Sequence, residues 1–162
     1  MSPPTPVPTA SPSPAPVHLV DPAPADAIFR ALGKAGLQIK ANTAGAGRLG
    51  REPIRRINAT YLDWPLVVSE YSSSKALAKA KPWKVGAKPA QGEPPIALIG
   101  LNILIEWGPI TTGVRPGKPE ARELAALTSL IGILNPLISP LKARTIVPIA
   151  IPDPSPKPSA KP

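Results

Sequence analysis

The sequence predicts an α+β fold in two layers, a mainly antiparallel sheet of three to five strands with helices packed on one face. Segments with helical spacing of apolar residues alternate with short segments rich in β-branched residues. Proline concentrates at the ends, with nine of 26 prolines in residues 1–25 and six in residues 148–162. We therefore expect a disordered Pro/Ser/Thr-rich arm at 1–24, one α+β domain at 25–147, and a disordered Pro/Lys-rich tail at 148–162.

The first part of the domain predicts a helix followed by a short strand. Residues 24–37 carry apolar side chains at helical spacing, and Gly36 offers a left-handed stop. Residues 37–41 alternate like an edge strand, and residues 42–53 are expected to form a basic loop.

A hairpin and a second helix are predicted next. Residues 54–62 and 66–72 alternate as strands around an Asp-Trp-Pro turn, because Pro65 fixes its own φ. Residues 72–81 begin with serines, which cap helices, and continue with good helix formers.

The segment from Ile96 to Trp107 is the most apolar stretch of the chain and predicts one central strand. It is too short for the ~20 residues of a transmembrane helix. As a continuous strand it would have one wholly apolar face under the helices, formed by Ala97, Ile99, Leu101, Ile103, Ile105 and Trp107. Its other face would be mixed and only partly covered.

The last part predicts a long helix and an edge strand. Residues 118–141 keep a heptad-like spacing of apolar residues, Leu124 among them, and Pro136 should kink or end this helix. Residues 143–151 are the expected edge strand.

The composition excludes several chemistries within the domain. The chain has no cysteine, and its single histidine, His18, lies in the N-terminal arm. Disulfides, thiolate metal sites, Ser-His-Asp triads and histidine-rich zinc sites are therefore excluded there. We expect no cofactor, no metal site and no catalytic residues, although carboxylates, lysines, hydroxyls and tyrosines remain as chemical groups.

Three polar residues mark a candidate binding surface. Glu70 and Glu106 end two predicted strands, and Asn102 shares the parity of Glu106. If the strands were adjacent, the two carboxylates would approach, and one raised pKa would give a general acid and base. The alternative is that strand ends and exposed sheet faces carry polar residues without any function.

The charge balance favours anionic partners. Nineteen basic against ten acidic residues give a net charge of +9, and Arg55, Arg56, Lys75 and Lys79 are the candidate polyanion contacts. The partner expected is a polyanionic surface, with no integral membrane span. Nucleic acid is the less favoured alternative, because no recognition signature for it is present.

Two short motifs have simpler explanations than chemistry. Gly45 to Gly50 match G-x-G-x-x-G, but no helix is predicted after them to bind a pyrophosphate. Ser72 to Lys75 match S-x-x-K, but the accompanying elements are missing and helix capping explains the serines.

The stretches "ALGKAGLQI", "PLVVSEYSSSKALAKA" and "ALIGLNILIEW", within the predicted order of elements, resemble small uncharacterised α+β domains of bacterial surface lipoproteins. The stretches cover about a third of the chain, and the lipidation cysteine is missing. The resemblance implies a non-catalytic, extracytoplasmic domain with a binding or structural role at the bacterial cell surface. The alternatives are a small basic nucleic-acid-binding protein, a carboxylate-dependent hydrolase, and a cytoplasmic location.

Overall fold

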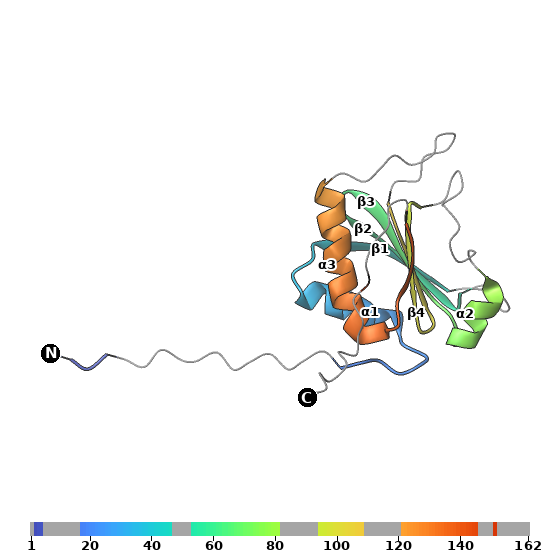
Figure 1. The fold of residues 1–162 in the computed structure, drawn as a ribbon, viewed down its shortest axis with the longest axis horizontal. Coiled ribbons are helices and arrows are strands. Elements are labelled where there is room, and N and C mark those ends of the chain that lie inside the picture. Colours follow the sequence, from blue (N-terminus) through green and yellow to red (C-terminus); the bar gives the residue numbers. More distant parts are fainter. Residues whose placement is uncertain are drawn as a thin grey trace, which may run out of the picture.

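The fold is an open antiparallel sheet covered by helices, as the computed structural model shows (Figure 1). The structure describes residues 2–4, 17–46, 53–81, 94–108, 121–145 and 151, and over residues 41–46 the backbone alone. Within these residues there are six strands and three helices. The predicted α+β class is confirmed, and the sheet is one strand larger than the upper limit expected.

The elements follow one another in an order close to that predicted. They are α1 (Ala25–Lys34), β1 (Ile39–Ala46), β2 (Arg55–Tyr61), β3 (Trp64–Glu70), α2 (Ser74–Ala80), β4 (Ile96–Gly100), β5 (Ile103–Trp107), α3 (Ala121–Ile138) and β6 (Lys142–Thr145). The strands lie in the order β1-β2-β3-β5-β4-β6, and every neighbouring pair is antiparallel.

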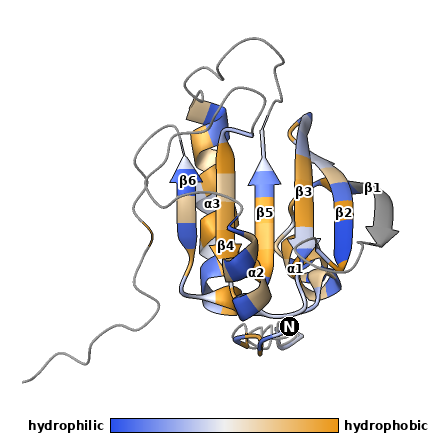
Figure 2. Cartoon of the chain, turned by 90° about the vertical axis from the view of Figure 1, so that its right-hand side faces the viewer, coloured by the Kyte–Doolittle hydropathy of each residue, from blue (hydrophilic) through white to orange (hydrophobic). Residues whose placement is uncertain are grey.

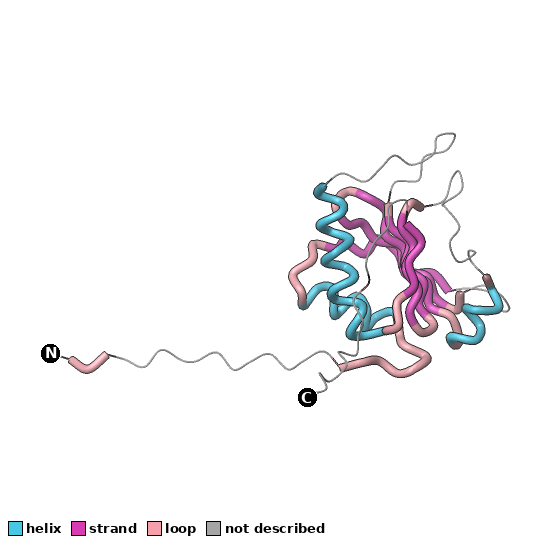
Figure 3. Tube along the Cα trace, viewed as in Figure 1, coloured by secondary structure: helices cyan, strands magenta, loops and turns pink. Residues whose placement is uncertain are grey.

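The helices occupy both faces of the sheet, whereas the sequence predicted one. Helices α1 and α3 lie on one face, and α2 lies on the other (Figures 1 and 3). Leu77 of α2 is buried with Ala97 and Leu104 in a small cluster of its own, separate from the main core. Those apolar side chains on the second face explain why a third helix packs there.

The predicted central strand from Ile96 to Trp107 is wrong in one respect, because it is a hairpin. Residues Leu101 and Asn102 form a two-residue turn, and Gly100 then pairs with Ile103. Leu101 adopts a positive φ of 50°, which costs a non-glycine residue about 1 kcal/mol or more. Strands β4 and β5 both lie in the interior of the sheet, so the predicted central position of this segment is confirmed for each of them.

The turn reverses the expected faces of the first half of this segment. In β5, the odd-numbered residues Ile103, Ile105 and Trp107 face the main core, as predicted. In β4, Ile96 and Leu98 face that core, and Ala97 packs under α2 instead. Odd-numbered residues share one face of a sheet only as long as the strand is continuous, and a turn can exchange the faces of odd- and even-numbered residues.

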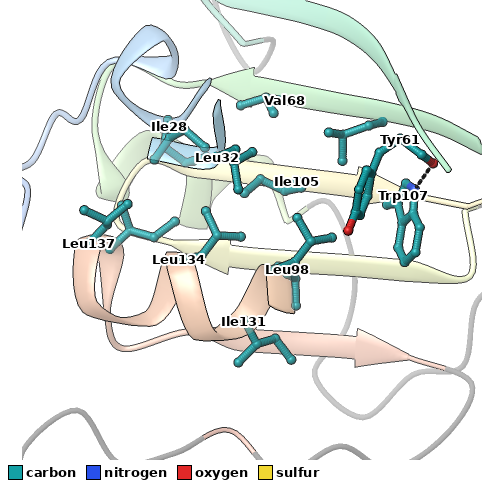
Figure 4. Close-up of a cluster of buried hydrophobic side chains, with 14 of the residues drawn as sticks. Ile28, Leu32, Tyr61, Val68, Leu98, Ile105, Trp107, Ile131, Leu134 and Leu137 are labelled. Atoms are coloured by element: carbon teal, nitrogen blue, oxygen red, sulfur yellow. Dashed lines mark hydrogen bonds between the residues drawn. The ribbon is translucent and has the colours of Figure 1, made fainter. Parts of the chain in front are cut away.

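The main core lies between the sheet and helices α1 and α3 (Figure 4). Trp107 has no exposed surface, and its indole N–H donates a 3.0 Å hydrogen bond to the carbonyl oxygen of Tyr61. Its ring centroid lies 5.3 Å from that of Tyr61 and 5.1 Å from that of Trp64. The rest of the main core includes Ile28 and Leu32 of α1 and Ile131 and Leu134 of α3, together with the aliphatic residues of the inner strands.

Several boundaries differ from the predicted ones. The turn between β2 and β3 is formed by Leu62 and Asp63, both at positive φ, so that Trp64 and Pro65 belong to β3. Strand β1 continues through Ala46, where a loop was expected. In α3, Pro136 lies two residues before the end, and Leu124 is exposed rather than buried. Residues 146–150 of the expected edge strand lie outside the described residues.

The segment at residues 17–24, which we call the strap, is fastened to the domain. Four of its residues make hydrogen bonds to distant parts of the chain: His18 to Ser139, Leu19 to Leu137, Asp21 to Ser74, and Ala23 to Asn102. Ala23 is fully buried in the main core. The domain therefore begins earlier than the boundary predicted between residues 24 and 25.

Candidate binding surface

The structure places Glu70 and Glu106 on opposite faces of the sheet. Glu70 lies opposite Ile103, whose side chain belongs to the main core under α1 and α3. Glu106 lies opposite Val67 and Ala97, on the face that carries α2. The two carboxylates are separated by the sheet itself, so the expected acid–base pair does not form and the hydrolase alternative loses its site.

Glu70 has a structural role at the start of α1. Its Oε2 accepts a 2.9 Å hydrogen bond from the backbone N–H of Ala25, the first residue of that helix. The free N–H groups at a helix start need acceptors, and a negative charge also interacts favourably with the helix dipole there. Glu70 thus ties β3 to α1.

Asn102 is also structural. Its side chain has no exposed surface and makes three hydrogen bonds to backbone groups of the strap and of the residue after β3. The carbonyl oxygen Oδ1 accepts from the N–H of Ala23, and Nδ2 donates to the carbonyl oxygens of Ala23 and Tyr71. The predicted surface of Glu70, Asn102 and Glu106 is therefore not formed.

The two candidate arginines lie on opposite faces although they are adjacent in sequence. Arg55 pairs with Glu70 across the strands and forms an ion pair with Asp26 of α1, at 2.5 Å. Arg56 pairs with Ser69, and its exposed side chain lies on the face that carries α2. Only Arg56 is placed to contact a partner on that face.

The lysines of α2 point away from the sheet. Leu77 is buried against the sheet, with Ala76 and Ala80 packed beside it, whereas Lys75 and Lys79 are exposed. Their spacing of four residues puts both on the outer side of the helix. We call the sheet surface that carries α2, together with the outer side of α2, the α2 face.

The positive charge of the described residues is concentrated on the α2 face. Register, helix position and, for Lys81, adjacency to the end of α2 assign seven of the eleven described Lys and Arg residues to it: Lys40, Arg56, Lys75, Lys79, Lys81, Lys142 and Arg144. Two of the six described carboxylates accompany them: Glu106 on the sheet, and Asp21, which accepts a hydrogen bond from the N–H of Ser74 at the start of α2. The α1 and α3 side carries four of each sign: Arg30, Lys34, Arg55 and Arg122 with Asp26, Asp63, Glu70 and Glu123.

Tyr71 joins the charged and apolar parts of the α2 face. It is buried against Leu77 and Leu104, and this burial raises the pKa of its phenol, while the positive charge of Arg56 lowers it and the negative charge of Glu106 raises it. These three groups are therefore close enough to influence one another electrostatically.

Neither sequence motif forms a site in the part that the structure describes. Gly45 and Ala46 are paired with Arg56 and Arg55 as part of β1, so the glycine motif begins in a hairpin strand and not in a strand that leads to a helix. Its remaining residues lie outside the described ones. Ser73 caps α2 by accepting a hydrogen bond from the N–H of Ala76 at 3.1 Å, as expected for the serines. No cluster of potential metal ligands occurs among the described residues.

Four basic residues of the α2 face were not among the candidate contacts predicted from the sequence, and one of them, Lys81, directly follows α2. Lys40, Lys142 and Arg144 come from the two edge strands, far from α2 in the chain. The alternation of Lys142, Ala143 and Arg144 is the one sequence pattern that indicates a shared face for the two basic residues. In the structure Ala143 faces the core, and its two neighbours face the opposite side. The strand order, which brings β6 beside β4, was needed to place them.

Within the described part of the chain, α3 is the one helix long and apolar enough to qualify as a membrane span by length and composition. In the fold its buried residues pack on the sheet as part of the main core. Comparison with protein-family models, curated proteins and solved structures finds no match for this chain.

Proposed function

We propose that this protein is a non-catalytic domain of the bacterial cell surface that binds an anionic polymer through its α2 face. The observation that carries the proposal is the segregation of charge: seven basic and two acidic residues lie on the α2 face, against four of each sign on the opposite side. A one-sided positive field attracts polyanions over a distance of about 10 Å at moderate salt.

The accessibility of the basic side chains supports this proposal. Six of the seven, all except Arg144, are exposed. They come from β1, β2, α2 and β6, so the charge is spread over the face and not gathered in one sequence run. A spread of exposed cations suits a long anionic partner better than a small anion, which needs converging donors in a concave site.

The composition of the chain ends supports the cell-surface location. Residues 1–16 are rich in proline, serine and threonine, a composition that makes extended spacers. Such a spacer, together with the resemblance to surface lipoprotein domains, suits a domain held away from a membrane. Fractionation of the native host, with antibodies against the domain, tests the location, and recovery of all of it from the cytoplasm would contradict it.

A pair of matched variants tests the binding function. Arg55→Ala and Arg56→Ala each remove one positive charge from neighbouring positions of β2, but on opposite faces. We expect Arg56→Ala to weaken binding of heparin, used as a general polyanion probe, and Arg55→Ala to leave it within about twofold. Binding should weaken steeply as salt rises.

The same measurement defines failure. If heparin does not bind, or if the two arginine variants weaken its binding equally, the α2 face is not the binding surface. Lys75→Ala with Lys79→Ala extends the test to α2, where substitution by alanine keeps a good helix former and therefore spares the fold.

A further inference from the structure

Basic residues lie on both sides of α2 in one row of paired residues that crosses the sheet beneath it. From β2 to β6 the paired positions of this row are Arg56 (β2), Ser69 (β3), Leu104 (β5), Ile99 (β4) and Lys142 (β6), and beyond Arg56 the row continues to Gly45 of the edge strand β1. Arg56 and Lys142 are exposed, and Leu104 and Ile99 between them pack against α2. The row therefore has a positive charge on each side of the helix.

The lysines of α2 fill the interval between Arg56 and Lys142. Figure 2 shows α2 lying over β4 and β5, with β6 on one side and β3 and β2 on the other. Lys75 and Lys79 are exposed on the outer side of α2. A path across the strands thus meets Arg56, then the α2 lysines, then Lys142.

The length of this path follows from the sheet geometry. From β2 to β6 there are four inter-strand steps, and at ~4.8 Å a step the backbone positions of Arg56 and Lys142 are about 19 Å apart. A single small anion cannot contact both ends, whereas an extended chain with repeated negative charges can.

The described surroundings of the path disfavour a bilayer and a stacked base. The exposed large apolar residues among the described ones are Val17, Val20, Ile54 and Leu124, in the strap, before β2 and on α3, and none lies in α2 or in a strand of the sheet. The one described aromatic side chain on the α2 face, Tyr71, is only 6% exposed. Insertion into lipid needs apolar side chains and base stacking needs exposed rings, so a chain recognised by its charge alone fits best.

We infer that the α2 face binds a linear, flexible polyanion that lies across the strands, from Arg56 over α2 to Lys142. This inference rests on the proposed function and adds the flexibility of the polymer, its direction on the sheet and its minimum length. Flexibility matters because the chain must rise over α2 between the two ends. Affinity comes from several weak charge contacts made at once, so short chains lose most of it.

Inorganic polyphosphate provides the probe. We expect long-chain polyphosphate to bind the full-length protein at least tenfold more tightly than triphosphate, compared at equal concentrations of phosphate groups. Arg56→Ala and Lys142→Ala should each weaken binding of the long chain about threefold or more and lower its salt slope by about 0.7. Arg55→Ala and Arg122→Ala, which remove charges on the α1 and α3 side, are the matched controls and should change neither value.

The outcomes separate the inference from the function on which it rests. If polyphosphate binds and only the α2 lysines matter, or if triphosphate binds as tightly as the long chain, the path across the strands is wrong and the α2 face remains the site. If duplex DNA or vesicles with anionic lipids bind more tightly than polyphosphate at equal phosphate, the flexible linear polymer is the wrong partner. If no anionic probe binds, or if the control variants lose as much affinity as the test variants, both proposals fail.

Discussion

The side chain of Asn102 and the backbone of Ala23 bind each other in both directions. Oδ1 of Asn102 accepts from the N–H of Ala23 at 2.6 Å, and its Nδ2 donates to the carbonyl oxygen of Ala23 at 3.0 Å. The reciprocal pair resembles one rung of an antiparallel sheet, with a side-chain amide taking the place of a peptide. It fixes the strap to the turn between β4 and β5.

Replacing Asn102 by alanine should destabilise the domain. The substitution leaves the N–H and carbonyl of Ala23 and the carbonyl of Tyr71 without their partner. Since each buried group left unsatisfied costs about 1–3 kcal/mol, we expect the free energy of unfolding to fall by about 2–4 kcal/mol. Urea denaturation measures it, with exposed Gln38→Ala as the control, and an Asn102→Ala variant as stable as the control would contradict the assignment.

Truncation should separate the strap from the residues before it. Removal of residues 1–16 should leave the midpoint of thermal unfolding unchanged within about 2 °C, because their proline-rich composition provides no core. Removal of residues 1–24 eliminates the strap hydrogen bonds and the buried Ala23, and should lower the midpoint by several times that amount. Equal midpoints for the two truncated proteins would show that the strap adds no stability.

Two glycines provide an opposed pair of predictions. A Cβ added at Gly100 would lie 2.3 Å from the carbonyl oxygen of Ile138, so Gly100→Ala forces the end of α3 away from β4. We expect a loss of about 1–3 kcal/mol in the free energy of unfolding. At Gly132, within α3, an added Cβ meets nothing within 4 Å, and Gly132→Ala should stabilise by about 0.5–1 kcal/mol. Denaturation curves that shift in the same direction would refute this close approach.

Tyr71 should make stability depend on alkaline pH. Burial raises the pKa of its phenol above the ordinary 10.0, so the folded protein holds this proton more tightly than the unfolded chain does. The stabilisation is complete below about pH 10 and is lost as the pH rises through the folded-state pKa. The free energy of unfolding of Tyr71→Phe should therefore fall less than that of the unchanged protein between about pH 9 and about pH 11. Tyr61 is also buried with a raised pKa, but both proteins keep it, so it contributes equally to both. If the free energy of unfolding fell by the same amount in the two proteins, the role of Tyr71 would be contradicted.

The fold could be predicted from the sequence wherever a local signal marks an element. Gly36 adopts a φ of 83° at the end of α1, and Ser73 caps α2, as expected. The turn at Leu101 and Asn102 gave no such signal, because a leucine at positive φ is rare and neither residue is glycine or proline. The hydrogen bonds of Asn102 to the strap hold that turn, and they depend on contacts between distant segments.

The candidate site was less predictable, because it depends on faces and strand order. Arg56 and the α2 lysines could be recognised as exposed cations from their sequence patterns. The separation of Glu70 from Glu106 could not be predicted, because it depends on the register between their strands. Two strands with the same pattern of polar residues can pair in a register that puts two given residues on one face, or in a register that puts them on opposite faces. The edge-strand residues Lys40 and Lys142 join the surface only through the order of strands in the sheet.

The strap has a consequence for the order in which the protein assembles during synthesis. His18 bonds to Ser139, 121 residues later in the chain, and Leu19 bonds to Leu137 at the end of α3. A chain that emerges from the ribosome beginning at its N-terminus presents the strap long before its docking partners exist. His18 and Leu19 are therefore made first and fixed in place late, and a nascent chain halted before α3 leaves them without their partners Ser139 and Leu137.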